Sequence, residues 1–285
     1  MINLYWYEGL NLGDNLSAYI VKRLSGENVC FRQTFSLKHF VRNSLSGIYQ
    51  FLKGNFSIAK KQMSFTLNPV LIAVGSLLES STKRCICWGT GMAQPRLVPS
   101  GGRFIMTRGY LSRQLLLDSG FNVESDVCGD PALLMPLLYD NRKEQIPGRV
   151  GIIPHVSEVE AVKKLLGENN QFEVIDFRTK DINNTIDEIL YCTFVYSSSL
   201  HGLILCHAYG IPCLWFRLKV QTGGDFKFKD HFSAIRINFY EPLSIEDIKK
   251  GTRLSDSEER ASKDVIMKIQ NELISRAPFK VNFSH

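Results

Sequence analysis

The sequence predicts an α/β protein with two consecutive lobes, each built on a parallel β-sheet. Short apolar runs alternate with helical patterns almost throughout the 285 residues, and this alternation is typical of parallel strands joined by right-handed crossovers. The length accommodates two α/β units of about 130–150 residues each, and a polar stretch with a Pro-Gly pair at 139–148 is typical of a linker. We therefore expect Rossmann-like lobes at 1–140 and 141–254, followed by a helix and tail at 255–285.

The first lobe should open with a strand at Ile2–Tyr7, then a loop and a helix starting near Asp14, in which leucine and isoleucine recur at helical spacing. A later helix should end at Gly120, because glycine is common just after a helix C-terminus. The other buried strands expected in this lobe are Val70–Val74, Arg84–Trp88 and Arg103–Thr107.

The second lobe repeats this pattern. A capping box at Ser157–Glu160 should open a helix that ends at Gly167, and a later helix should end at Gly210. Beyond the lobe, a capping box at Ser255–Glu258 should start a helix that packs back on a lobe, and residues 276–285 should be frayed. The strands expected here are Val150–Ile153, Phe172–Phe177, Thr193–Tyr196 and Pro212–Phe216.

The composition is that of an ordinary globular protein, with 44% hydrophobic and 22% charged residues. These fractions exclude disorder, collagen and coiled coil. The longest apolar runs, around Pro69–Leu78 and Leu203–Leu214, are shorter than the roughly 20 residues that span a bilayer. The first residues lack the basic start and cleavage site of a signal peptide. We therefore expect a cytoplasmic protein.

Cysteine usage agrees with this expectation. The seven cysteines are an odd number without a CxxC pair, and most lie in apolar runs, where a free cysteine behaves as a small hydrophobe. A zinc site is the alternative, but the spacing of its candidate ligands matches no familiar pattern, so we expect no metal. Those candidates are Cys192, His201, Cys206 and His207.

The net charge of +6 arises in one segment. No acidic residue occurs between Glu27 and Glu79, and the phenylalanine-rich stretch at 32–61 lies inside that interval. Such a stretch could lie on an anionic membrane or hold a phosphorylated or acidic ligand, or it could be a solvated lobe edge. We expect no nucleic acid, because no recognised binding motif accompanies the charge. The six cations are Arg32, Lys38, Arg42, Lys53, Lys60 and Lys61.

Three unusual loops follow expected strands. Ligands of open parallel sheets bind outside the carboxyl ends of the strands, and free backbone N–H groups and helix N-termini favour an anion. The sequence therefore predicts a phosphate-bearing ligand between the two lobes. The loops are Asn11–Asn15, Gly89–Gly91 and Ser197–Gly202.

Each loop also has a purely structural interpretation. Asp14 could cap its helix, the Gly-Thr-Gly loop could be a tight turn, and the serine run could be an N-cap. His201 differs, because it lies in the first turn of a helix beside Gly202, where proton exchange is possible. The apolar neighbours of His207 favour packing instead.

Seven motifs occur in order along the chain: Asn11-Leu12-Gly13-Asp14-Asn15-Leu16, Gly75-Ser76-Leu77-Leu78, Trp88-Gly89-Thr90-Gly91, Gly129-Asp130-Pro131-Ala132-Leu133-Leu134, Ile153-Pro154-His155, Ser198-Ser199-Leu200-His201-Gly202 and Gly224-Asp225-Phe226-Lys227-Phe228. Their order and spacing resemble the polysaccharide pyruvyl transferase family. One departure is at Thr107–Ser112, where the family usually has Arg-Asp or Arg-Gly before the serine or threonine.

The resemblance implies two lobes facing across a cleft, similar to the GT-B glycosyltransferases. It also implies transfer of pyruvate from phosphoenolpyruvate to two hydroxyls of one sugar, which leaves a cyclic ketal and free phosphate without a further cofactor. The acceptor would be a glycan precursor, often lipid-linked, for a bacterial capsule or exopolysaccharide made at the inner face of the membrane. The first lobe would hold the acceptor and the second the donor.

By motif, the resemblance maps donor-site cations to Arg108, His201 and Lys219. An arginine can bind a carboxylate or phosphate bidentately, and a lysine supplies a point charge. His201 would give and accept the proton, with its pKa raised by bound anions, and Asp14 or His155 could activate the acceptor hydroxyls. Further donor-side residues would be Ser198, Ser199 and Gly202, and further acceptor or cleft residues Asn11, Gly13, Asn15, Gly89, Thr90 and Gly91.

Two other functions remain open. A GT-B glycosyltransferase using a nucleotide sugar shares the fold and the anion-binding loops, but it should carry an acidic residue for the ribose or sugar, and none stands out near Ser198–Gly210. A non-catalytic protein that binds glycans or sugar phosphates would bind ligand without turnover.

Overall fold

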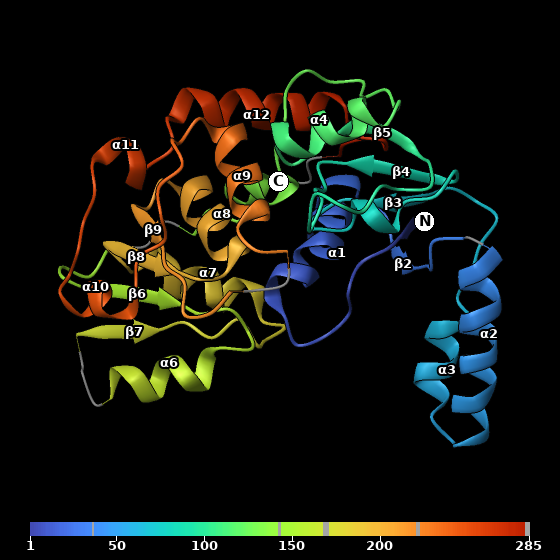
Figure 1. Ribbon diagram of the computed structural model, residues 1–285, viewed down its shortest axis with the longest axis horizontal. Helices are drawn as coiled ribbons and strands as arrows, with labels where there is room; N and C mark the ends of the chain where they lie inside the picture. Colours follow the sequence, from blue (N-terminus) through green and yellow to red (C-terminus); the bar gives the residue numbers. More distant parts are fainter. Residues whose placement is uncertain (36, 142–143, 168–170, 221–222, 283–285) are drawn as a thin grey trace.

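The computed structural model describes residues 1–35, 37–141, 144–167, 171–220 and 223–282, without the side chains of 37–39. It confirms the α/β class, with two parallel sheets flanked by helices (Figure 1). The first sheet has the order β2-β1-β3-β4-β5, and the second has the order β7-β6-β8-β9. The strands are β1 Ile2–Leu4, β2 Val29–Phe31, β3 Val70–Ile72, β4 Cys85–Trp88, β5 Arg103–Met106, β6 Val150–Ile153, β7 Phe172–Val174, β8 Phe194–Ser197 and β9 Cys213–Trp215.

Every strand expected from the sequence is present, and most are shorter than their apolar runs. The sequence pattern missed β2, a three-residue edge strand whose residues are all half-buried. Such a strand shows neither a continuous apolar run nor a clear alternation.

Both sheets are wound in the same way, with the first strand of each half inside the sheet between its second and third strands. The connection after β1 therefore runs to one side of the sheet and the connection after β3 to the other. The same holds for the connections after β6 and β8. In parallel sheets this arrangement opens a crevice at the carboxyl ends of the two strands concerned. The fold thus supplies two crevices, one in each sheet.

Helix α1, Leu12–Ser25, follows β1 and begins differently from the expectation. Its N-cap is Asn11, whose Oδ1 accepts a hydrogen bond from the Gly13 N–H at 3.2 Å. Asp14 therefore lies inside the first turn, and the interpretation that Asp14 caps the helix is wrong. The other helical segments of the first half, besides two that project from the body, are η1 Leu78–Ser80, α4 Tyr110–Asp118, η2 Pro131–Leu134 and α5 Met135–Leu138.

In the second half, α6 starts after Glu158 rather than at the expected Ser157 capping box. The Ser157 hydroxyl contacts His155 Nδ1 at 2.9 Å instead, so this expectation is wrong. The capping box at Ser255 is present but opens only the short helix α11, which ends at Glu259; the helix that packs back on a lobe is a separate one, so the expectation of one helix from Ser255 is wrong. The helices here are α6 Val159–Leu166, α7 Ile182–Leu190, α8 Leu200–Tyr209, α9 Phe226–Ile235, α10 Ile245–Lys249 and α11 Asp256–Glu259.

The C-terminal segment packs on the first half. Helix α12, Lys263–Ser275, lies against β4, because the Trp88 indole donates a hydrogen bond to the Leu273 carbonyl at 3.0 Å. Beyond the helix, the Asn282 N–H donates to the Leu24 carbonyl at 2.7 Å. Residues 276–282 are thus held against α1, and the expectation that they are frayed is wrong; 283–285 lie outside the described residues. One hydrophobic core runs continuously between the halves.

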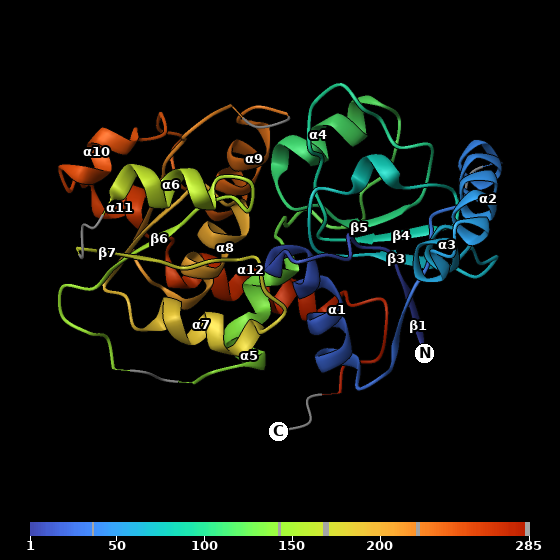
Figure 2. The same ribbon diagram turned by 90° about the horizontal axis from the view of Figure 1, so that it is seen from below.

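The basic segment forms a helical hairpin, α2 Leu37–Leu52 and α3 Phe56–Gln62, which projects from the body (Figures 1 and 2). None of the helices in the described part of the chain combines the length and apolar character that crossing a membrane requires.

Candidate active site

Loops from both crevices line one pocket of about 290 Å³. Residues after β1 and β3 come from the first sheet, and residues after β6 and β8 come from the second, so the two crevices open toward each other. We call this the inner pocket. Its lining residues are Tyr7, Asn11, Asp14, Ser76, Ala93, His155, Val156, Ser199, Leu200, His201 and Lys227.

His201 lines the inner pocket from the first turn of α8, whose N-cap is Ser199. Its Nε2 is buried and has no hydrogen-bond partner among the described residues. A Cβ at Gly13 would lie 2.2 Å from His201 Nδ1, so glycine at that position lets α1 approach the imidazole. Burial, together with the charges of Arg108 and Lys227, lowers the pKa of His201 to about 3. The imidazole is therefore neutral in the ligand-free protein.

Asp14 faces the same pocket from α1. The Asn11 amide donates a hydrogen bond to Asp14 Oδ2 at 2.7 Å, while its oxygen caps the helix. Burial raises the pKa of Asp14 to about 6, against the opposing effects of the Asn11 hydrogen bond and the Lys227 charge. A carboxyl group with this pKa can exchange a proton near neutrality.

Lys227, on α9, is the pocket lysine that sequence reasoning missed. Burial and the nearby Arg108 charge lower its pKa to about 8, against the effects of Glu158 and Asp14. A signal was present in the sequence, because Lys227 is the cation of the last of the seven motifs on which the resemblance rests. The expected Lys219 is exposed and does not line the pocket.

His155 lines the inner pocket after β6. The His155 backbone N–H donates a hydrogen bond to the Ser198 hydroxyl at 2.9 Å. That hydroxyl in turn donates a hydrogen bond to Glu158 Oε2 at 2.6 Å. Burial, followed by the charges of Lys227 and Lys219, lowers the pKa of His155 to about 4. Ser198 therefore positions a pocket residue without lining the pocket itself.

Arg108 lies directly behind the inner pocket and is fully buried. Its Nε donates to Asp230 Oδ2 at 3.0 Å, Nη1 to the Ser76 hydroxyl at 2.6 Å and Nη2 to the Met92 carbonyl at 2.8 Å. A buried guanidinium needs such partners because desolvation is costly. A direct contact between Arg108 and a donor stays a prediction. In this structure Arg108 holds Ser76 at the pocket and contributes positive potential.

The Gly-Thr-Gly loop after β4 builds the socket for that arginine and does not line the inner pocket. A Cβ at Gly91 would lie 2.4 Å from Arg108 Cζ, and one at Gly89 would lie 2.5 Å from Pro131. Thr90 donates to the Gly75 carbonyl at 2.8 Å, which joins this loop to the loop after β3.

Two residues near His201 have packing roles. A Cβ at Gly202 would lie 2.3 Å from Ser197 Oγ, so glycine lets α8 pack on its strand. His207 is buried, as expected, with its Nδ1 3.0 Å from His231 Nε2. In the part of the chain that the structure describes, no three His, Cys, Asp or Glu residues are grouped to hold a metal ion.

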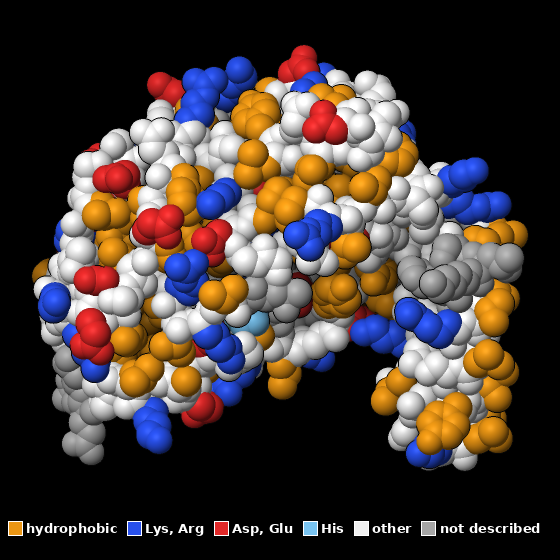
Figure 3. Space-filling view, in the orientation of Figure 1, with side chains coloured by type: hydrophobic (Ala, Val, Ile, Leu, Met, Phe, Trp, Pro, Cys, Tyr) orange, Lys and Arg blue, Asp and Glu red, His pale blue; other side chains and the backbone are white. Residues whose placement is uncertain are grey.

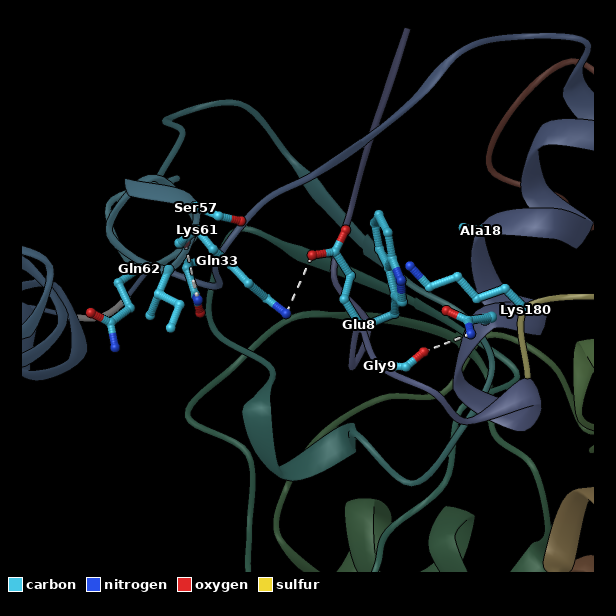
Figure 4. A pocket seen from close by; sticks show the side chains of 11 residues that line it. Glu8, Gly9, Ala18, Gln33, Ser57, Lys61, Gln62 and Lys180 are labelled. Atoms are coloured by element: carbon cyan, nitrogen blue, oxygen red, sulfur yellow. Dashed lines mark hydrogen bonds and ion pairs between the residues drawn. The ribbon is translucent and has the colours of Figure 1, made fainter. Parts of the chain in front are cut away.

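A second, larger pocket of about 780 Å³ lies on the other side of the 7–15 loop, and Asn15 lines it rather than the inner pocket (Figure 4). The Asn15 amide donates to the Gly9 carbonyl at 2.9 Å, which ties the loop to α1. We call this the outer pocket. Its lining residues are Trp6, Glu8, Gly9, Asn15, Ala18, Gln33, Ser57, Ile58, Lys61, Gln62 and Lys180.

Comparisons with known proteins agree with the motifs. An uncharacterized protein of Acanthamoeba polyphaga mimivirus is 34% identical over 177 residues, which are 60% of this chain and 61% of that protein. The aligned region therefore spans less than two thirds of that relative. No solved structure matches, so the likeness to the GT-B arrangement stays a prediction. The sequence profile described as "Polysaccharide pyruvyl transferase" matches residues 11–219. Since that match covers well over half of the chain, the chain belongs to the polysaccharide pyruvyl transferase family.

Proposed function

We propose that this protein transfers the pyruvyl group of phosphoenolpyruvate to two hydroxyls of one sugar in a polysaccharide precursor, forming a cyclic ketal and releasing phosphate. The observation that carries the proposal is the buried Nε2 of His201, which has no hydrogen-bond partner among the described residues, in a pocket that also presents Lys227 and Asp14. Family membership supports the pyruvyl transfer. The expected bacterial setting and the acceptor sugar stay predictions.

Positive potential selects the donor. Phosphoenolpyruvate carries a carboxylate and a phosphate, and Lys227 offers a direct ion pair from the pocket wall. Arg108 adds charge from behind, as its effects on the pKa values of His201 and Lys227 indicate. The N-terminus of α8, capped by Ser199, borders the same pocket, and a helix N-terminus favours an anion. The proposed site therefore needs no metal to bind the donor.

The bound anion would also prepare His201 for proton transfer. A nearby negative charge favours the imidazolium form, so donor binding raises a pKa that starts at about 3. The imidazolium then protonates the terminal enol carbon of the donor, and positive charge develops at the carbon that carries the phosphate. One sugar hydroxyl attacks that carbon, the phosphate leaves, and the second hydroxyl closes the ketal. Of the two hydroxyl protons, one restores His201 and the other leaves with phosphate.

The inner pocket must also supply a base that takes up protons from the acceptor hydroxyls. Asp14, with a pKa of about 6, is mostly ionised at neutral pH, so it can accept a proton from the first hydroxyl and pass it to the departing phosphate. His155 is the second candidate, since it lines the same pocket and is neutral above about pH 4.

The decisive experiment is a phosphate-release assay with phosphoenolpyruvate and a panel of acceptor glycans, preceded by thermal-shift measurements. We expect phosphoenolpyruvate to raise the melting temperature and UDP-sugars to leave it unchanged. Stabilisation by UDP-sugars alone would favour a glycosyltransferase. Stabilisation by phosphoenolpyruvate without phosphate release from any acceptor would favour a non-catalytic binding protein.

We further propose that the α2–α3 hairpin contacts an anionic membrane. Apolar side chains cover the projecting arm together with lysine and arginine (Figure 3). Near the turn between the helices, Leu52 is 78% exposed and Phe56 is 62% exposed. Lys53 lies 4.5 Å from the Tyr49 ring centre in the same region, and the segment has no acidic residue. Exposed apolar groups beside cations suit the headgroup region of an anionic bilayer.

Vesicle co-sedimentation tests this contact. We expect binding to vesicles that contain phosphatidylglycerol at low salt, weaker binding at high salt, and little binding to phosphatidylcholine alone. Leu52→Asp should reduce binding, whereas Met267→Asp, at a residue of α12 that is 54% exposed, should not. Absence of binding to the anionic vesicles at low salt would remove this part of the proposal.

A further inference from the structure

The outer pocket has no part in the proton chemistry proposed above, yet it has the size of a ligand site. Its volume of about 780 Å³ lies within the range of about 300–1,000 Å³ typical of small-molecule pockets. Its walls come from both halves of the molecule: α1 and α3 belong to the first half, and Lys180, just before α7, belongs to the second. A ligand here would contact both halves at once.

The chemistry of the lining is that of a sugar site. Trp6, which is 8% exposed, contributes part of the apolar wall, and its ring is held by an edge-on contact with Phe31 at 5.3 Å between centres. A rigid aromatic ring in a pocket wall offers apolar contact to a sugar ring. Polar groups with both donors and acceptors surround it, and hydroxyl groups can bond to these. The polar side chains are Asn15, Gln33, Ser57 and Gln62.

The charges in the outer pocket favour an anion. Lys61 and Lys180 reach in from opposite sides, with Glu8 between them (Figure 4). Lys61 forms an ion pair with Glu8 at 3.3 Å, which neutralises one of the two lysines. Within the described ranges no acidic group pairs with Lys180. The pocket therefore keeps one positive charge for a ligand.

The position of the outer pocket connects it to the inner pocket. One side of the 7–15 loop presents Tyr7, Asn11 and Asp14 to the inner pocket, and the other side presents Glu8, Gly9 and Asn15 to the outer pocket. A ligand that fills the outer pocket lies one loop away from Asp14. Helix α3 of the projecting hairpin forms the opposite wall, so the pocket also adjoins the membrane contact proposed for α2–α3.

We infer that the outer pocket binds the phosphate-bearing sugar at one end of the acceptor, with the sugar against Trp6 and its phosphate at Lys180, on the side of the pocket opposite the Lys61–Glu8 pair. This inference rests on the proposed function, because it supplies the acceptor that the inner pocket modifies. The pocket would hold the end of the glycan attached to its carrier, while the sugar to be modified extends past the loop to Asp14.

Fluorescence titration tests the site without requiring turnover. Trp6 lines the outer pocket, whereas Trp88 and Trp215 do not and are fully buried elsewhere in the core, so Trp6 is the tryptophan whose surroundings a pocket ligand changes. We expect glucose 1-phosphate to change the emission, methyl α-glucoside to bind at least about tenfold more weakly, and inorganic phosphate alone to cause no change. Trp6→Phe should remove the signal.

The charge requirement is tested with Lys61→Met/Lys180→Met, which should weaken glucose 1-phosphate binding about tenfold or more. Lys163→Met, an exposed lysine of α6, is the matched control and should bind as the wild type does. Equal affinity of the double variant, an equal response to inorganic phosphate, or an unchanged signal in Trp6→Phe would each overturn the inference. If circular dichroism shows that Trp6→Phe does not fold, the variant at Lys61 and Lys180 still decides the question.

The outcome is independent of the proposed reaction. If no acceptor supports phosphate release but glucose 1-phosphate changes the Trp6 emission and its binding depends on the lysines, the proposed sugar-phosphate site is supported and the proposed reaction is not. If phosphate release occurs but glucose 1-phosphate binding does not depend on these residues, the proposed reaction is supported and the acceptor site lies elsewhere.

Discussion

The two pockets share one loop but differ in how far their charged side chains are removed from solvent. In the inner pocket the ionisable groups are half-buried, and their partial desolvation shifts the pKa of His201 to about 3, of Asp14 to about 6 and of Lys227 to about 8. In the outer pocket, Lys180 is exposed and the Lys61 side chain is 35% exposed. Desolvated groups suit proton transfer, whereas solvated charges suit reversible recognition. We therefore expect substitutions in the inner pocket to change catalysis and stability, and those in the outer pocket to change affinity.

The largest expected effect is that of His201→Asn. Loss of a general acid–base group typically costs about 10²–10⁴ in rate, and asparagine keeps a polar side chain of smaller size. Phosphate release from phosphoenolpyruvate and acceptor should fall by that factor, while the far-ultraviolet circular dichroism and the melting temperature stay near those of the wild type. Turnover close to normal would show that His201 is not the proton donor.

The second effect concerns stability. Arg108 and Asp230 are both fully buried and form an ion pair at 2.8 Å, so Arg108→Met leaves a buried carboxylate without its cation. Breaking a buried pair typically costs about 3–5 kcal/mol. Asp230 still accepts two hydrogen bonds from Ser112, at 2.7 Å each, which favours the lower end of that range.

Urea unfolding compares this loss of stability with the loss caused by a substitution in the outer pocket. The Lys61–Glu8 pair is partly exposed, and removing such a pair by Lys61→Met should cost less than about 1 kcal/mol. If the two substitutions lower the free energy of unfolding by similar amounts, the contrast between the pockets is wrong.

The sequence predicted much of this fold but only part of the site. Apolar runs bounded by glycine and proline located the strands, and the loops after them supplied His201, Asp14 and His155 to the inner pocket. These residues lie next to the elements that position them, so local pattern was sufficient.

The remaining features depend on contacts between distant segments. Arg108 is paired with Asp230, 122 residues away, and no local pattern reveals that its guanidinium is already occupied. Lys227 reaches the pocket because α9 packs beside α8, which the spacing from His201 does not show. Asn11 and Asp14 are both residues that cap helices well, and only the observed helix start decides between them.

A smaller effect distinguishes the two candidate bases. With a pKa of about 6 in the free protein, Asp14 loses its basic form as the pH falls, so kcat/KM should decline below about pH 6. Asp14→Asn should lower kcat/KM at pH 7.5 by about 10²-fold and remove that acidic limb. A limb that persists in the variant would assign the base to another group, and one centred near pH 4 would indicate His155.

The smallest expected effect is the uptake of a fraction of a proton by Lys227 when an anion binds. Because its pKa is about 8, about half of the molecules carry a neutral amine at pH 8, and a bound anion raises that pKa. Sulfate does not itself titrate in this range, so its binding should take up as much as about half a proton per site, measured by calorimetry in buffers of different ionisation enthalpy. Lys227→Met should abolish the uptake, whereas Lys229→Met, an exposed lysine of the same helix, should keep it. Uptake that persists without Lys227 would mean that another group receives the proton, and the assignment of Lys227 as the cation that contacts the donor would fail.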